Sequence, residues 1–259
     1  MSRVDLLKYG ARQDLHTHTT YCDGKNTPRE MIEAALSKGL KRIGFSGHSP
    51  SPCPHEDYAM CPAEIASYIA EIRELAEEYR DRIEVLCGIE QDVYSPPAPE
   101  GLDYIVGSVH YVKTDCGYFA VDIDRGNLMR NCDTHFGGDM IALCEAYFSG
   151  YEQLADMKFD IVGHIDLISK FNRGGALFDE NDERYLAAAR RAVDLLIPTG
   201  ALFEINTGAM SRGYRDAPYP SPAIYEYIRE KGGRFILSGD THKAENLCFG
   251  FDEWERLLK

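Results

Sequence analysis

Hydrophobic and polar residues form two kinds of segment along the chain. Short apolar runs, several of them β-branched and bounded by glycine, predict buried strands, and they lie at 14–15, 42–46, 83–87, 104–106, 161–162, 202–205 and 235–237. Segments with apolar residues three and four positions apart predict amphipathic helices, and they lie at 28–37, 63–79, 139–157, 180–196 and 221–231. This alternation predicts parallel strands joined by crossover helices, either in an open sheet or closed into a barrel.

Length and composition favour one globular domain over residues 1–259. The 259 residues are 44% hydrophobic and 27% charged, which is ordinary for a single α/β barrel. Segment 115–138 is the least readable part, and we treat it as a lid or an insertion. The first sixteen residues have no continuous apolar core, and no run approaches the roughly 18 apolar residues of a membrane span. We therefore expect a cytoplasmic protein.

Net charge limits the possible partners, and cysteine spacing indicates the state of the thiols. The formal charge of −14, without a Lys/Arg cluster, disfavours DNA or RNA as a partner. A small anionic molecule stays compatible with this charge, because bound cations reverse the local field. The eight cysteines form no CxxC pair, which indicates reduced, mostly structural thiols.

Six of the eight histidines and three carboxylates follow predicted strands at their C-terminal ends, where barrel enzymes place their chemistry. They are His16, His18, Asp23, His48, Glu90, His110, His164, Asp240 and His242. Taken alone, each has an ordinary interpretation; Asp23 beside Gly24 is typical of a turn, for example. The joint pattern predicts a metal centre, because the imidazoles of an i, i+2 pair in extended chain project from one face.

The number and type of these side chains indicate more than one ion. Six imidazoles and three carboxylates exceed the needs of one tetrahedral zinc, and they predict two or three divalent ions with Glu90 as a bridge. Nitrogen and oxygen ligands together suit zinc, manganese or iron. We expect His135 on the surface, and we do not expect His55 in the site.

The segments that carry these residues resemble the PHP (polymerase and histidinol phosphatase) family, and within it the monofunctional phosphatases of histidinol phosphate. The resemblance covers essentially the whole chain. Its motifs are DLHTHTTYCDG at 14–24, GFSGHSP at 44–50, GIEQDV at 88–93, GSVHYV at 107–112, FGGDMIALCEAYFS at 136–149, VGHIDLISKF at 162–171 and LSGDTH at 237–242.

The resemblance implies a distorted TIM-like barrel of seven β/α units that holds three ions. It implies three ligand sets: His16, His18, Glu90 and Asp240 for the first ion; Glu90, His110 and His164 for the second; Asp23, His48 and His242 for the third. It also implies hydrolysis of L-histidinol phosphate to L-histidinol and phosphate, a step of histidine biosynthesis.

Roles in catalysis and substrate binding follow as expectations. Glu90, Asp23 and His242 are the catalytic candidates, and either His242 or a water molecule near Asp23 would protonate the leaving alkoxide. Arg173 and Arg212 are candidates to clamp the phosphate with their guanidinium forks, and their ordinary interpretation is solvated surface. The ammonium and imidazole of the substrate lead us to expect a further carboxylate in the pocket, which the sequence does not single out.

Other functions compete with this interpretation. One is a PHP phosphoesterase that acts on another small phosphate ester, such as a nucleotide, a sugar phosphate or phosphotyrosine. A metal-dependent amidohydrolase is disfavoured, because Glu90 stands where a bridging lysine would be expected. A noncatalytic metal-binding domain is disfavoured because no ligand is missing, and a nuclease domain because of the acidic charge. The sequence does not indicate an oligomeric state.

Overall fold

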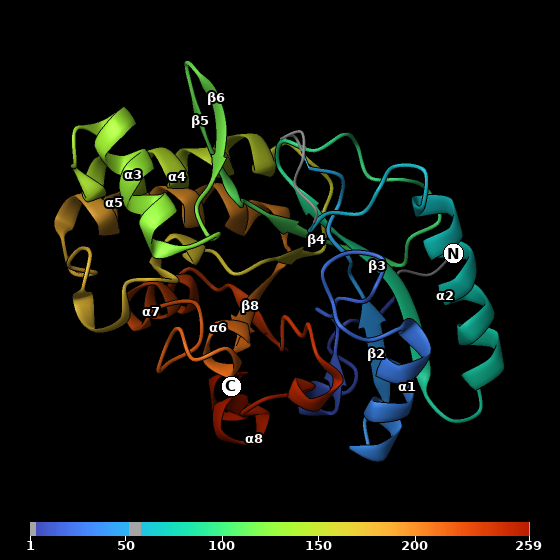
Figure 1. Cartoon of the computed structure of the whole chain (residues 1–259). Helices are drawn as coiled ribbons and strands as arrows, with labels where there is room; N and C mark the ends of the chain where they lie inside the picture. Colours follow the sequence, from blue (N-terminus) through green and yellow to red (C-terminus); the bar gives the residue numbers. More distant parts are fainter. Residues whose placement is uncertain (1–3, 52–57, 259) are drawn as a thin grey trace.

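Seven parallel strands form the central sheet of the computed structural model, which describes residues 4–51 and 58–258. The strands are β1 (Gln13–Asp14), β2 (Arg42–Phe45), β3 (Glu84–Asp92), β4 (Tyr104–Ser108), β7 (Ile161–Val162), β8 (Leu202–Asn206) and β9 (Arg234–Ser238). They lie side by side in this order and curve into a nearly closed barrel (Figure 1). The predicted α/β barrel of seven strands is therefore confirmed.

The barrel closes where the first strand meets the last. Thr17 and Thr241 form a parallel bridge beyond the ends of β1 and β9. The His18 N–H donates to the Thr241 carbonyl at 2.8 Å, and the Thr241 N–H donates to the His16 carbonyl at 2.9 Å. This bridge lies within the two i, i+2 pairs of predicted ligands, so closing the barrel brings those pairs together.

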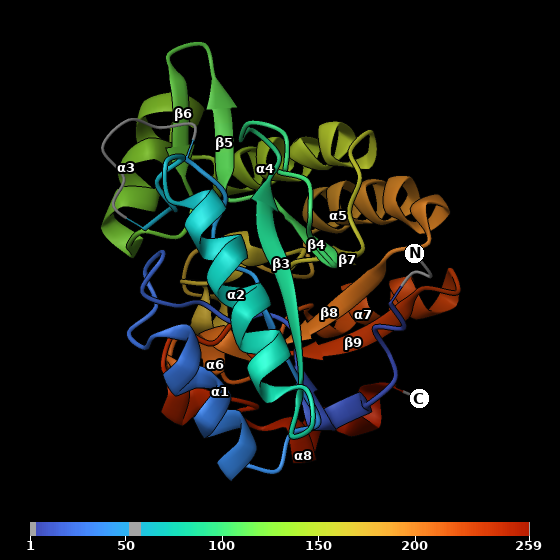
Figure 2. The same cartoon turned by 90° about the vertical axis from the view of Figure 1, so that its right-hand side faces the viewer.

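Helices cover the outside of the barrel (Figures 1 and 2). The predicted ones are confirmed with shifted ends, as α1 (Pro28–Ser37), α2 (Ile65–Tyr79), α4 (Met140–Ala155), α5 (Glu183–Leu196) and α7 (Pro222–Glu230). Thr27 and Glu30 form a capping box at the start of α1, which satisfies two backbone donors. Short helices occur at α6 (Gly208–Ser211) and α8 (Phe251–Trp254). In the described residues, no helix has both the length and the hydrophobicity that crossing a bilayer requires.

Segment 115–138, which the sequence left unread, contains the second strand of a hairpin and a helix. Strands β5 (Tyr111–Thr114) and β6 (Gly117–Ala120) pair antiparallel, and α3 (Arg125–Phe136) follows them. The hairpin projects beyond the rim of the barrel in both views (Figures 1 and 2). This insertion begins directly after His110, so it lies beside the predicted site.

The interior of the barrel changes from apolar to polar toward the C-terminal ends of the strands. The layer further from the C-terminal ends of the strands is one buried apolar cluster. It consists of Leu15, Leu86, Tyr104, Val106, Ile161, Leu202 and Ile236. Two residues further along, the same face of β3, β4, β8 and β9 carries Gly88, Ser108, Glu204 and Ser238. Gly88 leaves room for the Tyr104 ring, since a Cβ there would lie 2.5 Å from Tyr104 Cζ. The polar layer is therefore supported from below by a solid apolar layer.

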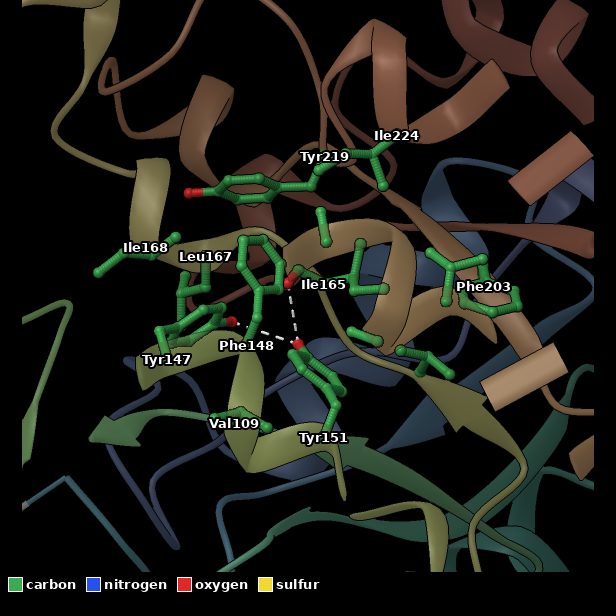
Figure 3. Close-up of a cluster of buried hydrophobic side chains, with 14 of the residues drawn as sticks. Val109, Tyr147, Phe148, Tyr151, Ile165, Leu167, Ile168, Phe203, Tyr219 and Ile224 are labelled. Carbon is green, nitrogen blue, oxygen red and sulfur yellow. Dashed lines mark hydrogen bonds between the residues drawn. The ribbon is translucent and has the colours of Figure 1, made fainter. Parts of the chain in front are cut away.

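An aromatic cluster packs α4 against the loop that follows β7 (Figure 3). The hydroxyls of Tyr147 and Tyr151 lie 3.2 Å apart, and the Tyr151 hydroxyl donates to the Ile165 carbonyl at 3.0 Å. All three residues are buried. Because Ile165 follows His164 directly, this packing fixes the position of a predicted ligand.

Cysteines are free thiols in the part of the chain that the structure describes. Cys87, Cys132 and Cys144 are buried, as expected for structural thiols. Cys53 and His55 lie outside the described residues.

Asp14 stabilises the seam of the barrel. Its buried carboxylate accepts the Gly239 N–H at 3.0 Å and the Thr241 hydroxyl at 3.1 Å. A Cβ on Gly239 would lie 2.3 Å from Asp14 Oδ2, so glycine is needed for this close approach. Asp14 therefore connects β1 to the chain just beyond β9.

Replacing Asp14 with alanine should lower the free energy of unfolding by about 3 kcal/mol, because buried donors at the seam would lose their acceptor. Urea unfolding followed by circular dichroism measures the change. Asp81→Ala is the control, because Asp81 has 89% of its side chain exposed, and surface substitutions change stability by about 0.5 kcal/mol or less. Equal stability of the two variants would contradict a structural role for Asp14.

Candidate metal centre

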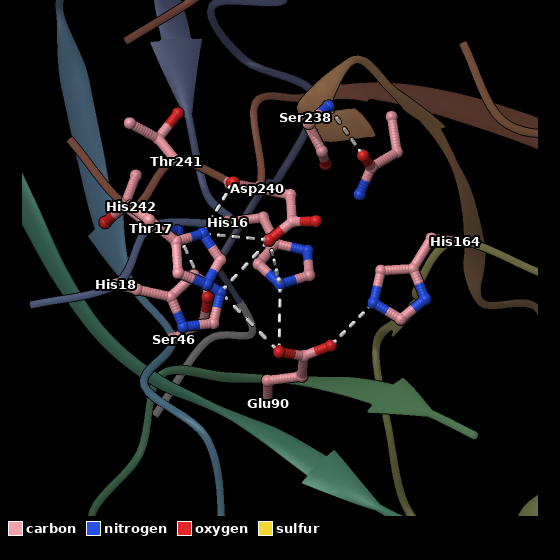
Figure 4. A network of polar contacts seen from close by, with 12 residues as sticks. His16, Thr17, His18, Ser46, Glu90, His164, Ser238, Asp240, Thr241 and His242 are labelled. Carbon is pink, nitrogen blue, oxygen red and sulfur yellow. Dashed lines mark hydrogen bonds and ion pairs between the residues drawn. The ribbon is translucent and has the colours of Figure 1, made fainter. Parts of the chain in front are cut away.

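The carboxylate of Glu90 faces the imidazoles of the predicted site, among them those of His16 and His164 (Figure 4). Five imidazole nitrogens lie near it: His48 Nδ1 at 2.9 Å, His16 Nε2 at 3.1 Å and His18 Nε2 at 3.6 Å from Oε2, and His164 Nε2 at 2.8 Å and His110 Nε2 at 3.2 Å from Oε1. The Ser108 hydroxyl also donates to Oε1 at 2.7 Å. The expectation that Glu90 follows its strand is wrong, because β3 continues to Asp92. Glu90 thus projects inward from a strand that holds it rigidly.

All nine predicted ligands come together at the C-terminal mouth of the barrel. Their ligand atoms form four groups, each within 4.8 Å: His18, Asp23, His48 and His242; His16, Glu90 and His164; His16, His18 and Asp240; and His48, Glu90 and His110. The groups share His16, His18, His48 and Glu90. Shared side chains are what neighbouring ions with bridging ligands require.

The outermost group lies around Asp23. The rings of His18 and His242 stack with centroids 4.0 Å apart and an angle of 18° between their planes. Asp23 Oδ2 lies 3.2 Å from His242 Nε2, and its Oδ1 lies 3.7 Å from His48 Nε2. His48 and His242, which lie far apart in the sequence, therefore share one carboxylate.

Buried atoms without hydrogen bonds indicate that these residues fit divalent ions. Among the described residues, His16 Nε2, His18 Nε2, Asp23 Oδ1 and Glu90 Oε2 are buried and make no hydrogen bond. Burying such atoms costs free energy unless another partner compensates. Imidazole nitrogens and carboxylate oxygens at converging positions are the ligand set of zinc, manganese or iron.

Burial and neighbouring charges shift the pKa values of the candidate ligands. Burial lowers the pKa of His18 to about 3, and the neighbouring imidazoles of His242 and His48 act in the same direction. Burial alone would raise the pKa of Glu90, but the imidazoles of His16 and His110 outweigh it and hold this pKa well below its usual value. At neutral pH the carboxylate of Glu90 is therefore ionised, and His18 offers a free lone pair.

Glu204 supports two of the candidate ligands, and the sequence analysis missed it. Its Oε1 lies 2.6 Å from His16 Nδ1, and its Oε2 accepts the His164 N–H at 3.0 Å. Asn206 Nδ2 also donates to Oε2, at 2.8 Å. A carboxylate on the outer nitrogen of a ligand histidine fixes the ring and increases its basicity. The available signal was a glutamate inside the apolar run LFEIN of β8.

Asp92 supports His110 in a similar way. Its Oδ2 accepts the His110 N–H at 2.8 Å and lies 3.2 Å from His110 Nδ1. Asp92 is buried at the end of β3. Two residues after Glu90 on the same strand, it thus orients an imidazole that contacts Glu90.

The two candidate arginines are placed differently. Arg212 Nη2 donates to Asp240 Oδ2 at 2.8 Å, Arg212 Nη1 lies 2.9 Å from His242 Nδ1, and Arg212 lines the cavity at the mouth of the barrel. Arg173 forms a two-pronged pair with Asp216 at 2.8 and 2.5 Å, its side chain is 59% exposed, and it is not among the residues that line this cavity. The structure brings Arg212 to the site but not Arg173.

The cavity has a volume of ≈ 430 Å³. The candidate ligands His48, His110, His164, Asp240 and His242 line its floor. Lys25, Lys170, Arg212 and Lys243 supply positive charge on its walls. His135 lies away from it, exposed and stacked on Phe119 with ring centroids 5.7 Å apart, as expected. A small anion can therefore reach the site.

A barrel of seven parallel strands with buried histidine and carboxylate groups at its C-terminal mouth defines a class of metal-site α/β proteins. The PHP domain family matches residues 14–208, and the chain belongs to this family. It is a PHP-family hydrolase with buried His, Glu and Asp clusters that are suited to metal ions.

Two curated relatives match over most of their length. A Deinococcus radiodurans protein named "probable histidinol-phosphatase" is 32% identical over 257 residues, which cover 92% of this chain and 89% of that protein. The histidinol-phosphatase of Bacillus subtilis is 27% identical over 272 residues, which cover 93% of this chain and 97% of that protein.

Two solved structures share the fold. A candidate histidinol phosphatase from Listeria monocytogenes superposes with a TM-score of 0.79 at 19% identity, over 93% of this chain and 99% of that one. The histidinol phosphate phosphatase of Lactococcus lactis, complexed with zinc, L-histidinol and phosphate, superposes with a TM-score of 0.59 at 17% identity, over 95% of this chain and 92% of that one.

Zinc binding at pH 7 should release protons. Burial lowers the pKa of His16, but Glu204 and Glu90 outweigh burial and hold this pKa well above its usual value, so the free site carries a proton that an ion must displace. Calorimetric titration of the metal-free protein in two buffers of different ionisation enthalpy counts the protons. The exposed His135→Asn variant should release the same number. Heats that do not depend on the buffer would contradict this prediction.

Glu204→Gln should weaken zinc binding about 10-fold to 100-fold, because the charge that orients His16 would be lost. Competition with a chelating dye measures the affinity. The matched control is Glu84→Gln at the other end of the barrel, where Glu84 pairs with Arg42. If both variants bind zinc like the unmodified protein, Glu204 does not support the metal centre.

Proposed function

We propose that this protein is a metal-dependent phosphomonoesterase that hydrolyses L-histidinol phosphate to L-histidinol and phosphate. The observation that carries the proposal is the Glu90 carboxylate among five imidazoles, three of which (His48, His110 and His164) line a cavity that Arg212 also lines. Such a site suits a small phosphate ester. The names of the two curated relatives, and the zinc, L-histidinol and phosphate in the Lactococcus structure, support the substrate.

The nine clustered residues are the proposed ligands of two or three divalent ions, zinc, manganese or iron. Glu90 is the proposed bridge, since it belongs to two of the four groups and also contacts His18. When bound, the ions would supply positive charge opposite the phosphoryl oxygens and lower the pKa of the attacking water. The side chains would hold the ester in line for this attack and exclude bulk water.

Arg212 is the proposed phosphate clamp. Its Nη2 is held by Asp240, while its Nε is buried and makes no hydrogen bond to any described residue. Burial would lower the pKa of the guanidinium, but Asp240 outweighs burial and keeps this pKa above its usual value. Arg212 would therefore stay charged and donate to a phosphoryl oxygen.

His242, or a water molecule held by Asp23, is the proposed proton donor for the leaving group. Where Arg212 donates to His242 Nδ1 at 2.9 Å, the proton of a neutral His242 is on Nε2, 3.2 Å from Asp23 Oδ2, whereas the Asp240 carbonyl, 3.0 Å from Nδ1, would favour the other tautomer. His242 could hand this proton to the alkoxide, with Asp23 orienting the ring. The same nitrogen is a candidate ligand atom, and the use of His242 as a ligand would leave the proton to a water molecule held by Asp23.

A second candidate substrate class has one observation in its favour. Lys25 and Lys243 add two exposed cations to the cavity wall. A second anionic group, as in a nucleotide or a sugar that carries two phosphates, would pair with them. Extended nucleic acid is disfavoured by the net charge of −14.

Phosphate release at steady state tests the function. We expect the zinc- or manganese-loaded protein to have a kcat/KM for L-histidinol phosphate at least about 100-fold above that for p-nitrophenyl phosphate or a nucleotide monophosphate. Glu90→Gln should lower kcat on the order of 1000-fold, whereas Glu84→Gln should retain activity. Equally slow turnover of all esters would refute the substrate, and full activity of Glu90→Gln would refute the role of the carboxylate.

A further inference from the structure

One carboxylate of the cavity has no part in the candidate metal centre. Of the described residues, Asp23, Asp122 and Asp240 are the carboxylates that line the cavity. Asp23 and Asp240 belong to the groups of candidate ligands, and Asp122 does not. Asp122 lies between β6 and α3, in the insertion that follows His110. It is therefore the carboxylate that remains for the organic part of a substrate.

Lys170 holds Asp122 in place. Lys170 Nζ donates to the Asp122 carbonyl at 2.8 Å and to its Oδ2 at 3.0 Å. The Lys170 side chain is only 12% exposed, and Nζ lies 5.5 Å from the ring centre of Phe171 and 5.4 Å from that of Tyr214. Its charge is thus shared between a carboxylate and two aromatic faces. One oxygen of Asp122 is fixed from behind by this contact.

The other oxygen of Asp122 is available to a ligand. Within residues 4–51 and 58–258, no hydrogen bond is made to Asp122 Oδ1, and the side chain is 28% exposed. Burial would raise the pKa of Asp122, but Lys170 outweighs burial and keeps this pKa below its usual value. The carboxylate is therefore ionised at neutral pH and faces the cavity with an open acceptor.

Asp122 shares one cavity with the groups that would bind a phosphate. The Val121 N–H donates to the His110 carbonyl at 2.9 Å, which places Asp122 beside the strand end that carries a candidate ligand. Arg212 lines the same cavity and is near enough to Asp122 for their charges to interact. A molecule that carries both a phosphate and a cation can therefore meet both charges within this cavity.

We propose that Asp122 binds the ammonium group of the substrate, so that the cavity selects monophosphate esters whose alcohol carries a cation close to the ester oxygen. This inference rests on the proposed function and deepens it. Apolar Ala120 and Ile123, on either side of Asp122 in the cavity wall, would contact the remaining organic group. Lys170 is a positioning residue in this arrangement, because it orients Asp122.

A pair of esters that differ only in the ammonium group tests the assignment. L-histidinol phosphate carries it, and 3-(imidazol-4-yl)propyl phosphate lacks it. Asp122→Asn should lower kcat/KM for L-histidinol phosphate about 10-fold to 100-fold, the usual loss for a hydrogen bond to a charged group. It should change kcat/KM for the analogue by about twofold or less. Zinc content should stay equal to that of the unmodified protein.

Asp124→Asn is the matched control. It is the same substitution two residues further on, where Asp124 caps α3 by accepting the Asn127 N–H at 2.8 Å, and asparagine caps helices equally well. This variant should leave both esters unaffected. An equal loss for both esters in Asp122→Asn would overturn the proposal, because it would indicate a role in the fold of the insertion. An unchanged preference for the ammonium ester would overturn it as well.

Binding of the product separates this inference from the proposed function. Calorimetric titration with L-histidinol requires no hydrolysis, and Asp122→Asn should weaken this binding at least about 10-fold. If the protein hydrolyses no ester, the proposed function fails, and the ammonium site is judged by this titration alone. Equal binding of L-histidinol by the two proteins, or no binding by the unmodified protein, would overturn the ammonium site.

Discussion

The interaction on which the rest of the structure depends is the contact of one buried carboxylate, Glu90, with five imidazoles. An isolated carboxylate at this depth would cost several kcal/mol or become protonated. The surrounding nitrogens keep it ionised, and the apolar layer below, around Leu86 and Tyr104, strengthens each electrostatic contact by excluding water. The barrel therefore concentrates polar groups in one layer and supports that layer with a tightly packed apolar base.

The site is complete only when the barrel is closed. His16 and His18 follow the first strand, Asp240 and His242 follow the last, and these pairs meet only if the seam forms. The bridge between Thr17 and Thr241, and the Asp14 carboxylate behind it, hold the two ends together. An open sheet with the same strands would leave the two pairs at opposite edges. The seam is thus a condition for binding ions as much as for stability.

The sequence predicted the strands, the main helices and the nine clustered residues, because each depends on a local pattern or on a position at a strand end. It missed the hairpin of β5 and β6 and the polar helix α3, where neither hydrophobic period was clear. It missed Glu204, because a glutamate inside the apolar run of β8 indicates a buried carboxylate but not which residues that carboxylate contacts. It did not predict that Arg173 pairs with Asp216, because Asp216 lies 43 residues further along the chain. The roles of the clustered residues stay predictions.

The barrel strands and the insertion between β4 and α4 contribute different parts of the cavity wall. The groups that would meet a phosphate come from the ends of barrel strands, whereas Asp122 comes from the insertion, between the hairpin and α3. Changes in the length or sequence of this segment can alter the outer wall of the cavity without moving Glu90 or the seam. With the role proposed for Asp122, substitutions in this segment would change which alcohol the site accepts while the groups that meet the phosphate stay in place.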